Sequence, residues 1–312
     1  MMSKKLMTGI LALTLSLGVM GCTQGETKAP ETSGPDTKVE EEEKEVLSWS
    51  VQPTLGIVKG DYYRVEERFR QGHLGVLEVV KQGDELVHVA FNEMTRPNYY
   101  NRFYQNVPKR MSEYNFDMGE KKGAAWMQSV ELVEKQMLEE QRLTGEFDVV
   151  SGASNSIHQS MIPLAEKLVP LLDAPSEEKF YSIAEVLGGG LTGRLVVILK
   201  DGIISSVHYD EIFADEKDEI EDPAQKKYYR LSKYESVLYD EPSRIGFNVQ
   251  MDALNEKVQQ TQDLLDISEL PSVDTTGNYA SSGFTIRNEA WDNYLSLAEK
   301  LLLEIQKDGF LN

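Results

Sequence analysis

The chain has 312 residues, with 32 basic side chains against 52 acidic ones and a formal net charge of −20 at pH 7. This charge argues against nucleic acid and anionic lipid head groups as partners, because proteins bind both by neutralising phosphates. A hydrophobic content of 40% is enough to build a core, and a single cysteine excludes both an internal disulfide and a thiolate metal cluster.

Residues 1–22 have the layout of a secretory signal peptide. Two lysines precede an apolar stretch, Leu6–Met20, of about 15 residues, which is short of the roughly 20 that a membrane-spanning helix needs. The stretch ends in Val-Met-Gly followed by Cys22, which resembles a bacterial lipobox. We therefore expect Cys22 to be acylated after cleavage, so that a lipid anchor holds the protein on the extracellular face of the cell membrane. The alternative is an uncleaved signal anchor with an incidental cysteine.

Residues 23–46 are rich in Thr, Glu, Pro and Gly and contain almost nothing apolar to bury. Such a segment cannot offset the conformational entropy that ordering would cost. We interpret it as a disordered acidic tether, which charge repulsion keeps extended between the membrane and the folded part of the chain.

The remaining sequence contains one pattern twice. In the first half, Gly72-x-x-Gly75 precedes two apolar runs, 76–80 and 85–91, that are joined by a short turn, and in the second half Gly190-x-x-Gly193 precedes runs at 194–199 and 203–209. β-Branched runs joined by Gly/Asp turns predict a β-hairpin in each half. Each half ends with Leu-Ala-Glu-Lys-Leu, at 164–168 and 297–301. We therefore predict a tandem duplication with domains at 47–175 and 176–312.

Apolar residues at helical spacing predict three helices, at 126–137, 157–171 and 291–305. Core packing is the preferred interpretation of these apolar stripes. The predicted fold class is α+β, with a small antiparallel sheet packed against helices in each domain.

The segment Asp148-x-x-Ser151-Gly152-Ala153-Ser154 immediately precedes the second predicted helix. Unpaired N–H groups and the dipole at a helix N-terminus favour an anion, and small residues let a phosphate approach the backbone closely. An ordinary helix-capping loop is the alternative interpretation.

This segment resembles the flavinylation motif Asp-x-x-(Ser/Thr)-Gly-Ala-(Thr/Ser) of the FMN-binding domain family. That family includes the C subunit of sodium-pumping NADH:quinone reductase, the G subunit of the Rnf complex and flavin-bearing surface lipoproteins. The resemblance extends to the Gly-x-x-Gly pattern, to the hairpin and to the helix after the motif, and it implies two tandem FMN-binding-type domains.

The resemblance also implies a role for each motif residue. Ser154 would carry covalent FMN through a phosphoester bond made by a separate ApbE-type flavin transferase. Asp148 corresponds to the acid that the transferase needs, while Ser151, Gly152 and Ala153 would shape the loop. Threonine is more usual at the position of Ser154, but serine offers the same nucleophilic oxygen.

The second half departs further from the motif. Its corresponding stretch, Ser282-Gly283-Phe284-Thr285, has a bulky ring in place of alanine, and Tyr279 stands where the acid should be. We therefore predict that Thr285 is unmodified and that the second domain is degenerate.

By this resemblance the protein is a membrane-anchored flavoprotein that carries electrons in extracellular electron transfer, with a membrane NADH dehydrogenase and quinone pool as the donor. It would be a carrier rather than a self-sufficient enzyme. The alternatives are a non-redox surface binding lipoprotein on a degenerate FMN-binding fold, and a flavin reductase with its own substrate.

Other residues give weaker signals. The four histidines (His73, His88, His158 and His208) have no ligand-like spacing, so no metal site is predicted. His158 stands one turn after Ser154, where it would approach a phosphate. Four aromatic residues could either stack on a flavin ring or pack in the core: Tyr99, Tyr100, Phe103 and Tyr104.

Overall fold

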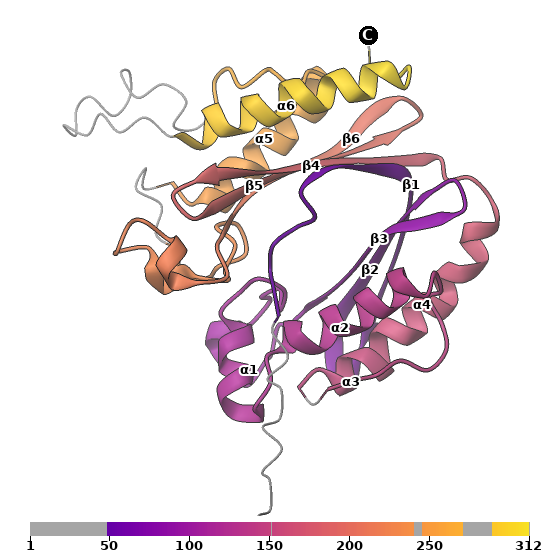
Figure 1. Ribbon diagram of the computed structural model, residues 1–312, viewed down its shortest axis with the longest axis vertical. Coiled ribbons are helices and arrows are strands. Elements are labelled where there is room, and N and C mark those ends of the chain that lie inside the picture. The colour runs from indigo at the N-terminus through magenta and orange to yellow at the C-terminus, as the bar shows by residue number, and fades with distance from the viewer. Residues whose placement is uncertain (1–48, 151, 240–244, 271–288, 312) are drawn as a thin grey trace, which may run out of the picture. The chain divides into compact units, whose positions relative to one another are not determined.

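The computed structural model describes residues 49–150, 152–239, 245–270 and 289–311 (Figure 1). These residues fall within one compact unit, Val46–Asn312. Cys22, the tether at 23–46, Ser151 and the segment containing Thr285 lie outside the described residues. The predicted α+β class is confirmed, because helices pack against a six-stranded antiparallel sheet of order β3-β2-β1-β4-β5-β6.

The six strands follow one another in two sets of three: β1 (Gly56–Phe69), β2 (His73–Gln82) and β3 (Glu85–Met94), then β4 (Glu178–Gly188), β5 (Leu191–Lys200) and β6 (Ile203–Phe213). Both predicted hairpins are confirmed as β2–β3 and β5–β6, with Val79 opposite Val89 and Val197 opposite Val207. The expected small sheet in each half is part of one continuous sheet, because β1 pairs with β4.

Alternating side chains of the strands point to opposite faces of this sheet. One face carries two hydrophobic cores, the first under α2 and α4 and the second under α5 and α6 (Figure 1). The opposite face carries a smaller apolar cluster around Tyr62, Val80, Phe180 and Ile198, where Tyr62 stacks on Phe180 at 5.8 Å between ring centroids.

The helices of the first half are α1 (Tyr114–Lys122), α2 (Trp126–Glu139), α3 (Ser154–Ser156) and α4 (Ile162–Leu168), and those of the second are α5 (Phe247–Thr261) and α6 (Glu289–Lys307). The predicted stripe of α2 is buried, and so are Trp291 and Ile305 of α6. Leu171, at the end of the second predicted stripe, is instead 48% exposed. No helix among the described residues is long and apolar enough to cross a membrane.

A single helical run leads from the motif to the end of the first half. It starts as α3, widens into a π-helical segment at Ile157–Met161, continues as α4 and ends as a 3-10 helix at Val169–Asp173. Pro163 is the second residue after the π segment. Because proline has no N–H to donate and its ring clashes with the carbonyl four residues earlier, a wider turn at this point accommodates it. Such π segments are frequent at functional sites.

In each half, a glutamine that follows a helix binds the backbone of the outermost strand of the sheet, β3 or β6. Gln141, just after α2, accepts the N–H of Leu86 at 2.8 Å and donates to its carbonyl at 3.0 Å. Gln262, just after α5, makes the same pair of contacts with Ile204, at 2.7 and 3.0 Å. The two halves therefore repeat in their hydrogen bonding as well as in the order of their elements.

Candidate functional site

Side chains of α2 hold the motif segment in place. The Asp148 N–H donates to the Gln136 side chain at 2.8 Å, and the Gln136 amide donates to the Asp148 carbonyl at 3.0 Å. Further along, the Ser129 hydroxyl donates to the Val150 carbonyl at 2.8 Å. The segment thus satisfies its backbone groups on the neighbouring helix instead of forming regular structure of its own.

The two small residues of the motif are required by packing. Gly152 has a φ of +130°, and a Cβ built on it would lie 2.9 Å from the carbonyl oxygen of Ala124. A side chain at this position would therefore be strained and would displace the backbone between α1 and α2. The next residue, Ala153, is part of the first hydrophobic core. Packing consequently sets the backbone path of Gly152 and Ala153, the two residues before Ser154.

Ser154 begins the helical run and is exposed to solvent. Its hydroxyl has no hydrogen-bond partner among the described residues, whereas the Ile157 N–H donates to the Ala153 carbonyl at 2.9 Å and closes the first turn. The N–H groups at the start of such a run lack intrahelical partners. The Ser154 hydroxyl is therefore accessible to a reactant at the place where the backbone favours an anion.

Beside the motif lies an open hollow of about 540 Å³. Residues from α2, from the 145–149 loop and from the helical run line it, among them Gln136, Glu140, Phe147, Asp148, His158 and Ile162. It therefore brings together Asp148 and His158, two of the residues singled out in the sequence, while Ser154 is outside its lining. No group of three or more His, Cys, Asp or Glu side chains among the described residues could hold a metal ion.

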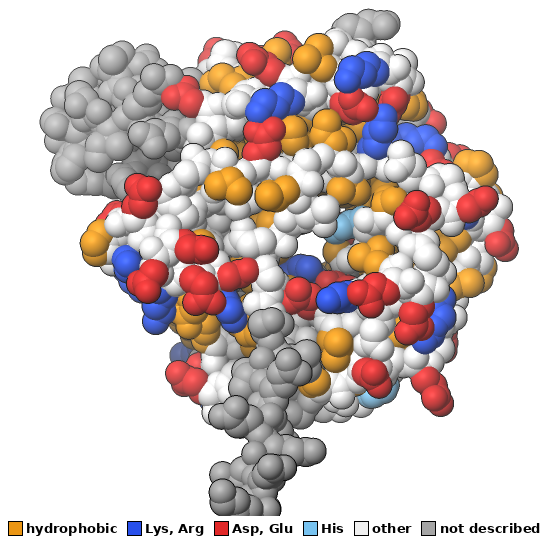
Figure 2. Space-filling view, in the orientation of Figure 1, with side chains coloured by type: hydrophobic (Ala, Val, Ile, Leu, Met, Phe, Trp, Pro, Cys, Tyr) orange, Lys and Arg blue, Asp and Glu red, His pale blue; other side chains and the backbone are white. Residues whose placement is uncertain are grey.

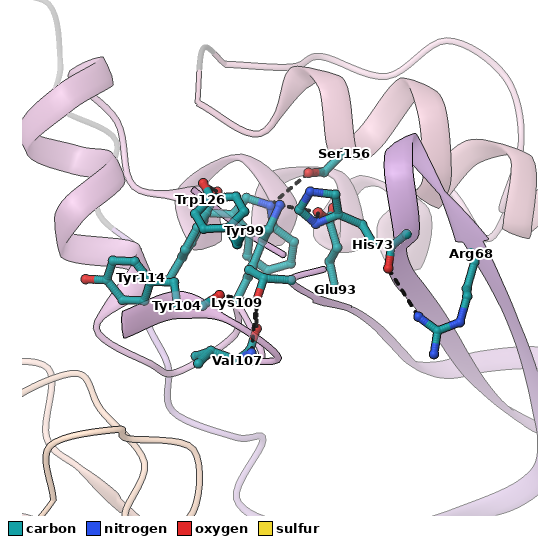
Figure 3. A network of polar contacts seen from close by, with 12 residues as sticks. Arg68, His73, Glu93, Tyr99, Tyr104, Val107, Lys109, Tyr114, Trp126 and Ser156 are labelled. Carbon is teal, nitrogen blue, oxygen red and sulfur yellow. Dashed lines mark hydrogen bonds and ion pairs between the residues drawn. The ribbon is translucent and has the colours of Figure 1, made fainter. Parts of the chain in front are cut away.

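Behind the first helical turn lies a buried polar network that the sequence did not reveal (Figure 3). The Trp126 indole N–H donates to Ser156 Oγ at 3.1 Å. Glu93 Oε1 forms an ion pair with Lys109 Nζ and lies 3.2 Å from His73 Nδ1. Glu93 is 1% exposed and Lys109 5% exposed. The network thus joins side chains from β2, β3, the loop before α1, and α3 at one buried site.

The surroundings favour the charged form of Glu93. Burial alone would raise the pKa of the Glu93 carboxyl, but the contacts with His73 and Lys109 outweigh burial and lower this pKa below its ordinary value. Burial lowers the pKa of Lys109, an effect that the charge of Glu93 opposes. The Lys109 ammonium also lies 5.0 Å from the centroid of the Tyr114 ring. The network therefore holds a carboxylate and an ammonium out of water.

The second half contains a matching ion pair. Lys233 Nζ lies 2.5 Å from Glu211 Oε2, and Glu211 Oε1 accepts hydrogen bonds from the Tyr209 hydroxyl at 2.8 Å and from the Asn293 amide at 2.9 Å. Glu93 faces Gly75 across the first hairpin, and Glu211 faces Gly193 across the second. The buried Glu–Lys pair is therefore common to both halves, whereas the histidine beside it occurs only in the first.

The four aromatic candidates separate into two groups. The Tyr99 ring meets His73 edge-on at 5.8 Å between centroids, and Tyr104 is buried in the first core. Tyr100 is 71% exposed, with its ring centroid 4.5 Å from that of Tyr99, and Phe103 is also exposed. Tyr100 and Phe103 consequently offer apolar ring surface to solvent, while the other two pack inside.

His88 and His208 lie within β3 and β6, as expected, on the sheet face away from the helices. Burial lowers the pKa of His88 to about 3 and that of His208 to about 4. Both imidazoles are therefore neutral near pH 7.

The chain matches no protein-family model and no curated protein. Among solved structures it is similar to the crystal structure of the CPE2226 protein from Clostridium perfringens, with 23% sequence identity over 37% of this chain and 90% of that one. The TM-score is 0.28, a level at which the similarity supports no conclusion about fold or function.

Proposed function

We propose that Ser154 carries FMN through a phosphoester bond and that the protein is an electron carrier held on the outer face of the membrane by acylated Cys22. One observation carries the proposal: the exposed hydroxyl of Ser154, which has no partner among the described residues, begins a helical run that Gly152 and Ala153 lead into along a path set by packing. Covalent attachment would keep the cofactor on an exported protein. The flavin would supply the redox chemistry, and the chain would position it and tune its surroundings.

The neighbouring residues suit the attachment step. Asp148 is exposed and lines the hollow together with His158, so a flavin transferase has access to the acid as well as to the acceptor. The hollow of about 540 Å³ falls within the range of roughly 300–1,000 Å³ that is usual for small-molecule and cofactor sites. Its carboxylates would repel the phosphate, so the ring system is the part of FMN that suits this hollow.

The finer architecture belongs to the same proposal. We propose that the halves are tandem FMN-binding-type domains, 47–175 and 176–312, and that only the first carries a flavin. The repeated strand order, the glutamine contact at each edge and the Glu–Lys pair in each half support a duplication. Electrons would come from a membrane NADH dehydrogenase and quinone pool.

A second candidate function follows from the motif's packing. Gly152 and Ala153 are needed for the backbone path whether or not a flavin is attached. The same residues are therefore compatible with a non-redox surface binding lipoprotein that retains the fold alone.

Intact-mass measurement after co-expression with an ApbE-type flavin transferase separates the two functions. The wild-type protein should gain one adduct of FMN size, Ser154→Ala should gain none, and Ser154→Thr should regain it because threonine offers the same oxygen. Asn155→Ala, a change at the next exposed position, is the matched control and should keep the adduct. An adduct that persists in Ser154→Ala would move the site elsewhere, and an unmodified wild-type protein would favour the non-redox function.

A further inference from the structure

The sheet face that carries His88 and Arg194 contains a cavity between the two halves, and α2 closes one side of it. Its volume is about 260 Å³, and its walls come from the N-terminal segment 50–54, from α2 and from strands of both halves. A second hollow of about 150 Å³ shares Ala90, Arg110, Met111 and Arg194 with it. Figure 2 shows this face hollowed near its centre, with histidine, basic and acidic side chains at the rim. Neither hollow is lined by a residue of the flavinylation motif.

Most charges in the cavity wall already have partners. Arg110 makes a two-pronged contact with Glu134, at 2.7 and 3.2 Å. Glu131 accepts the Ser50 N–H at 2.8 Å. At the rim, the Lys135 ammonium lies 3.9 Å from the Glu139 carboxylate. The positive charges of Arg110 and Lys135 are thus compensated by the protein itself.

Arg194 differs from these residues. It projects from β5 into both hollows, and no described residue forms a hydrogen bond or an ion pair with its guanidinium. The charges that act on it are more distant: Arg110 repels it, and Glu78 and Asp210 attract it. The nitrogens of Arg194 are not among the buried atoms that lack a partner, so its N–H donors remain open to an acceptor in the hollows. Such an arrangement suits a ligand that brings its own negative charge.

We propose that this cavity binds a small organic monocarboxylate, whose carboxylate pairs with Arg194 while its apolar part lies against Val58, Val89 and Leu138. A guanidinium matches a carboxylate through two parallel hydrogen bonds. Arg194 is the one cation of the wall without a direct ion-pair partner among the described residues. The nearby carboxylates repel a singly charged anion less strongly than phosphate, so a monoanion fits better. The volume lies below the roughly 300–1,000 Å³ of drug-sized sites, which restricts the ligand to a small acid.

Titration calorimetry with the full-length protein tests the site, with isovalerate, benzoate and inorganic phosphate as probes. Wild type should bind at least one of the two carboxylates, and phosphate should not bind. Arg194→Met should weaken carboxylate binding by at least about tenfold, because it removes the charged hydrogen bonds but keeps an unbranched apolar side chain. Arg102→Met, which replaces an exposed arginine outside the cavity, should bind like wild type.

Thermal unfolding without added ligand gives an independent measurement. Because Arg194 has no partner to lose in the described part of the chain, Arg194→Met should melt at or above the wild-type temperature. The proposal is overturned if neither carboxylate binds wild type, if Arg194→Met binds as well as wild type, if phosphate binds as tightly as the carboxylates, or if Arg194→Met is clearly destabilised. None of these outcomes depends on the flavin at Ser154.

Discussion

Replacing Gly75 with alanine tests whether the close approach of the motif helix to β2 depends on a missing side chain. A Cβ built on Gly75 would lie 1.9 Å from Ser160 Oγ and 3.2 Å from a methyl carbon of Leu164. Ser160 belongs to the π-helical segment two turns after the motif, and its hydroxyl is buried without a partner in the described structure. The extra methyl group therefore pushes directly on the helix that begins with Ser154.

The size of the effect follows from the contacts. Overfilling a well-packed core typically costs about 1–3 kcal/mol, and alanine regains roughly 0.5–1 kcal/mol through its better strand conformation. Gly75→Ala should therefore lower the free energy of unfolding by about 1–2 kcal/mol. The matched glycine of the second half, Gly193, faces only the flexible end of Leu187, at 3.0 Å. Gly193→Ala should consequently change the stability much less.

Chemical denaturation of four proteins measures this effect: wild type, Gly75→Ala, Ser160→Ala and the double variant. Ser160→Ala alone should be close to neutral, because its hydroxyl makes no hydrogen bond that is lost. The double variant should recover most of the loss, with a coupling free energy of about 1 kcal/mol between the two sites. If Gly75→Ala is as stable as wild type, or if Ser160→Ala gives no rescue, the close contact does not control this packing.

Three further changes probe a histidine, an ion pair and a side chain that binds the edge strand. His88→Gln should reduce the loss of stability that the protein shows as the pH falls. Below about pH 6.5 the histidine is protonated in the unfolded chain, but in the folded protein it stays neutral until about pH 3, so this group costs wild type up to about 1.4 kcal/mol of unfolding free energy per pH unit. Urea unfolding of both proteins at pH 7 and pH 5 measures the difference. Lys109→Met should cost about 3–5 kcal/mol because it leaves Glu93 charged and buried, and adding Glu93→Gln should restore part of that loss in the same denaturation assay. Gln141→Ala should cost about 1–3 kcal/mol and accelerate hydrogen exchange at the Leu86 amide; unchanged exchange there would contradict the edge contact.

Local patterns were sufficient to predict several elements of the fold. β-Branched runs joined by Gly/Asp turns gave both hairpins, and apolar residues at helical spacing gave α2 and α6. The sequence did not indicate β1, because the charged run Glu66-Glu67-Arg68 ends its alternation of apolar and polar residues. Strand pairing stabilises β1 in place of a regular apolar face: its first part, Gly56–Asp61, pairs with β4, and its second part, Asp61–Phe69, pairs with β2.

The buried network could not be predicted from spacing along the chain. His73, Glu93 and Lys109 stand far apart in sequence, and they meet only because the register of β2 and β3 places Gly75 opposite Glu93. One signal was nevertheless present in the repeat: Asn92-Glu93 and Asp210-Glu211 stand at equivalent places in the two hairpins. Acidic residues at the same place in both copies, within otherwise apolar strands, indicate a shared buried partner.

The β1–β4 pairing has a consequence for how the two copies depend on each other. If either half were produced alone, its β1 or β4 would become an exposed edge strand. The unpaired backbone groups of such a strand can pair with other chains and cause aggregation. The second half thus shields β1 from self-association whether or not it binds a cofactor of its own. Selection for solubility alone would therefore be enough to preserve the second half.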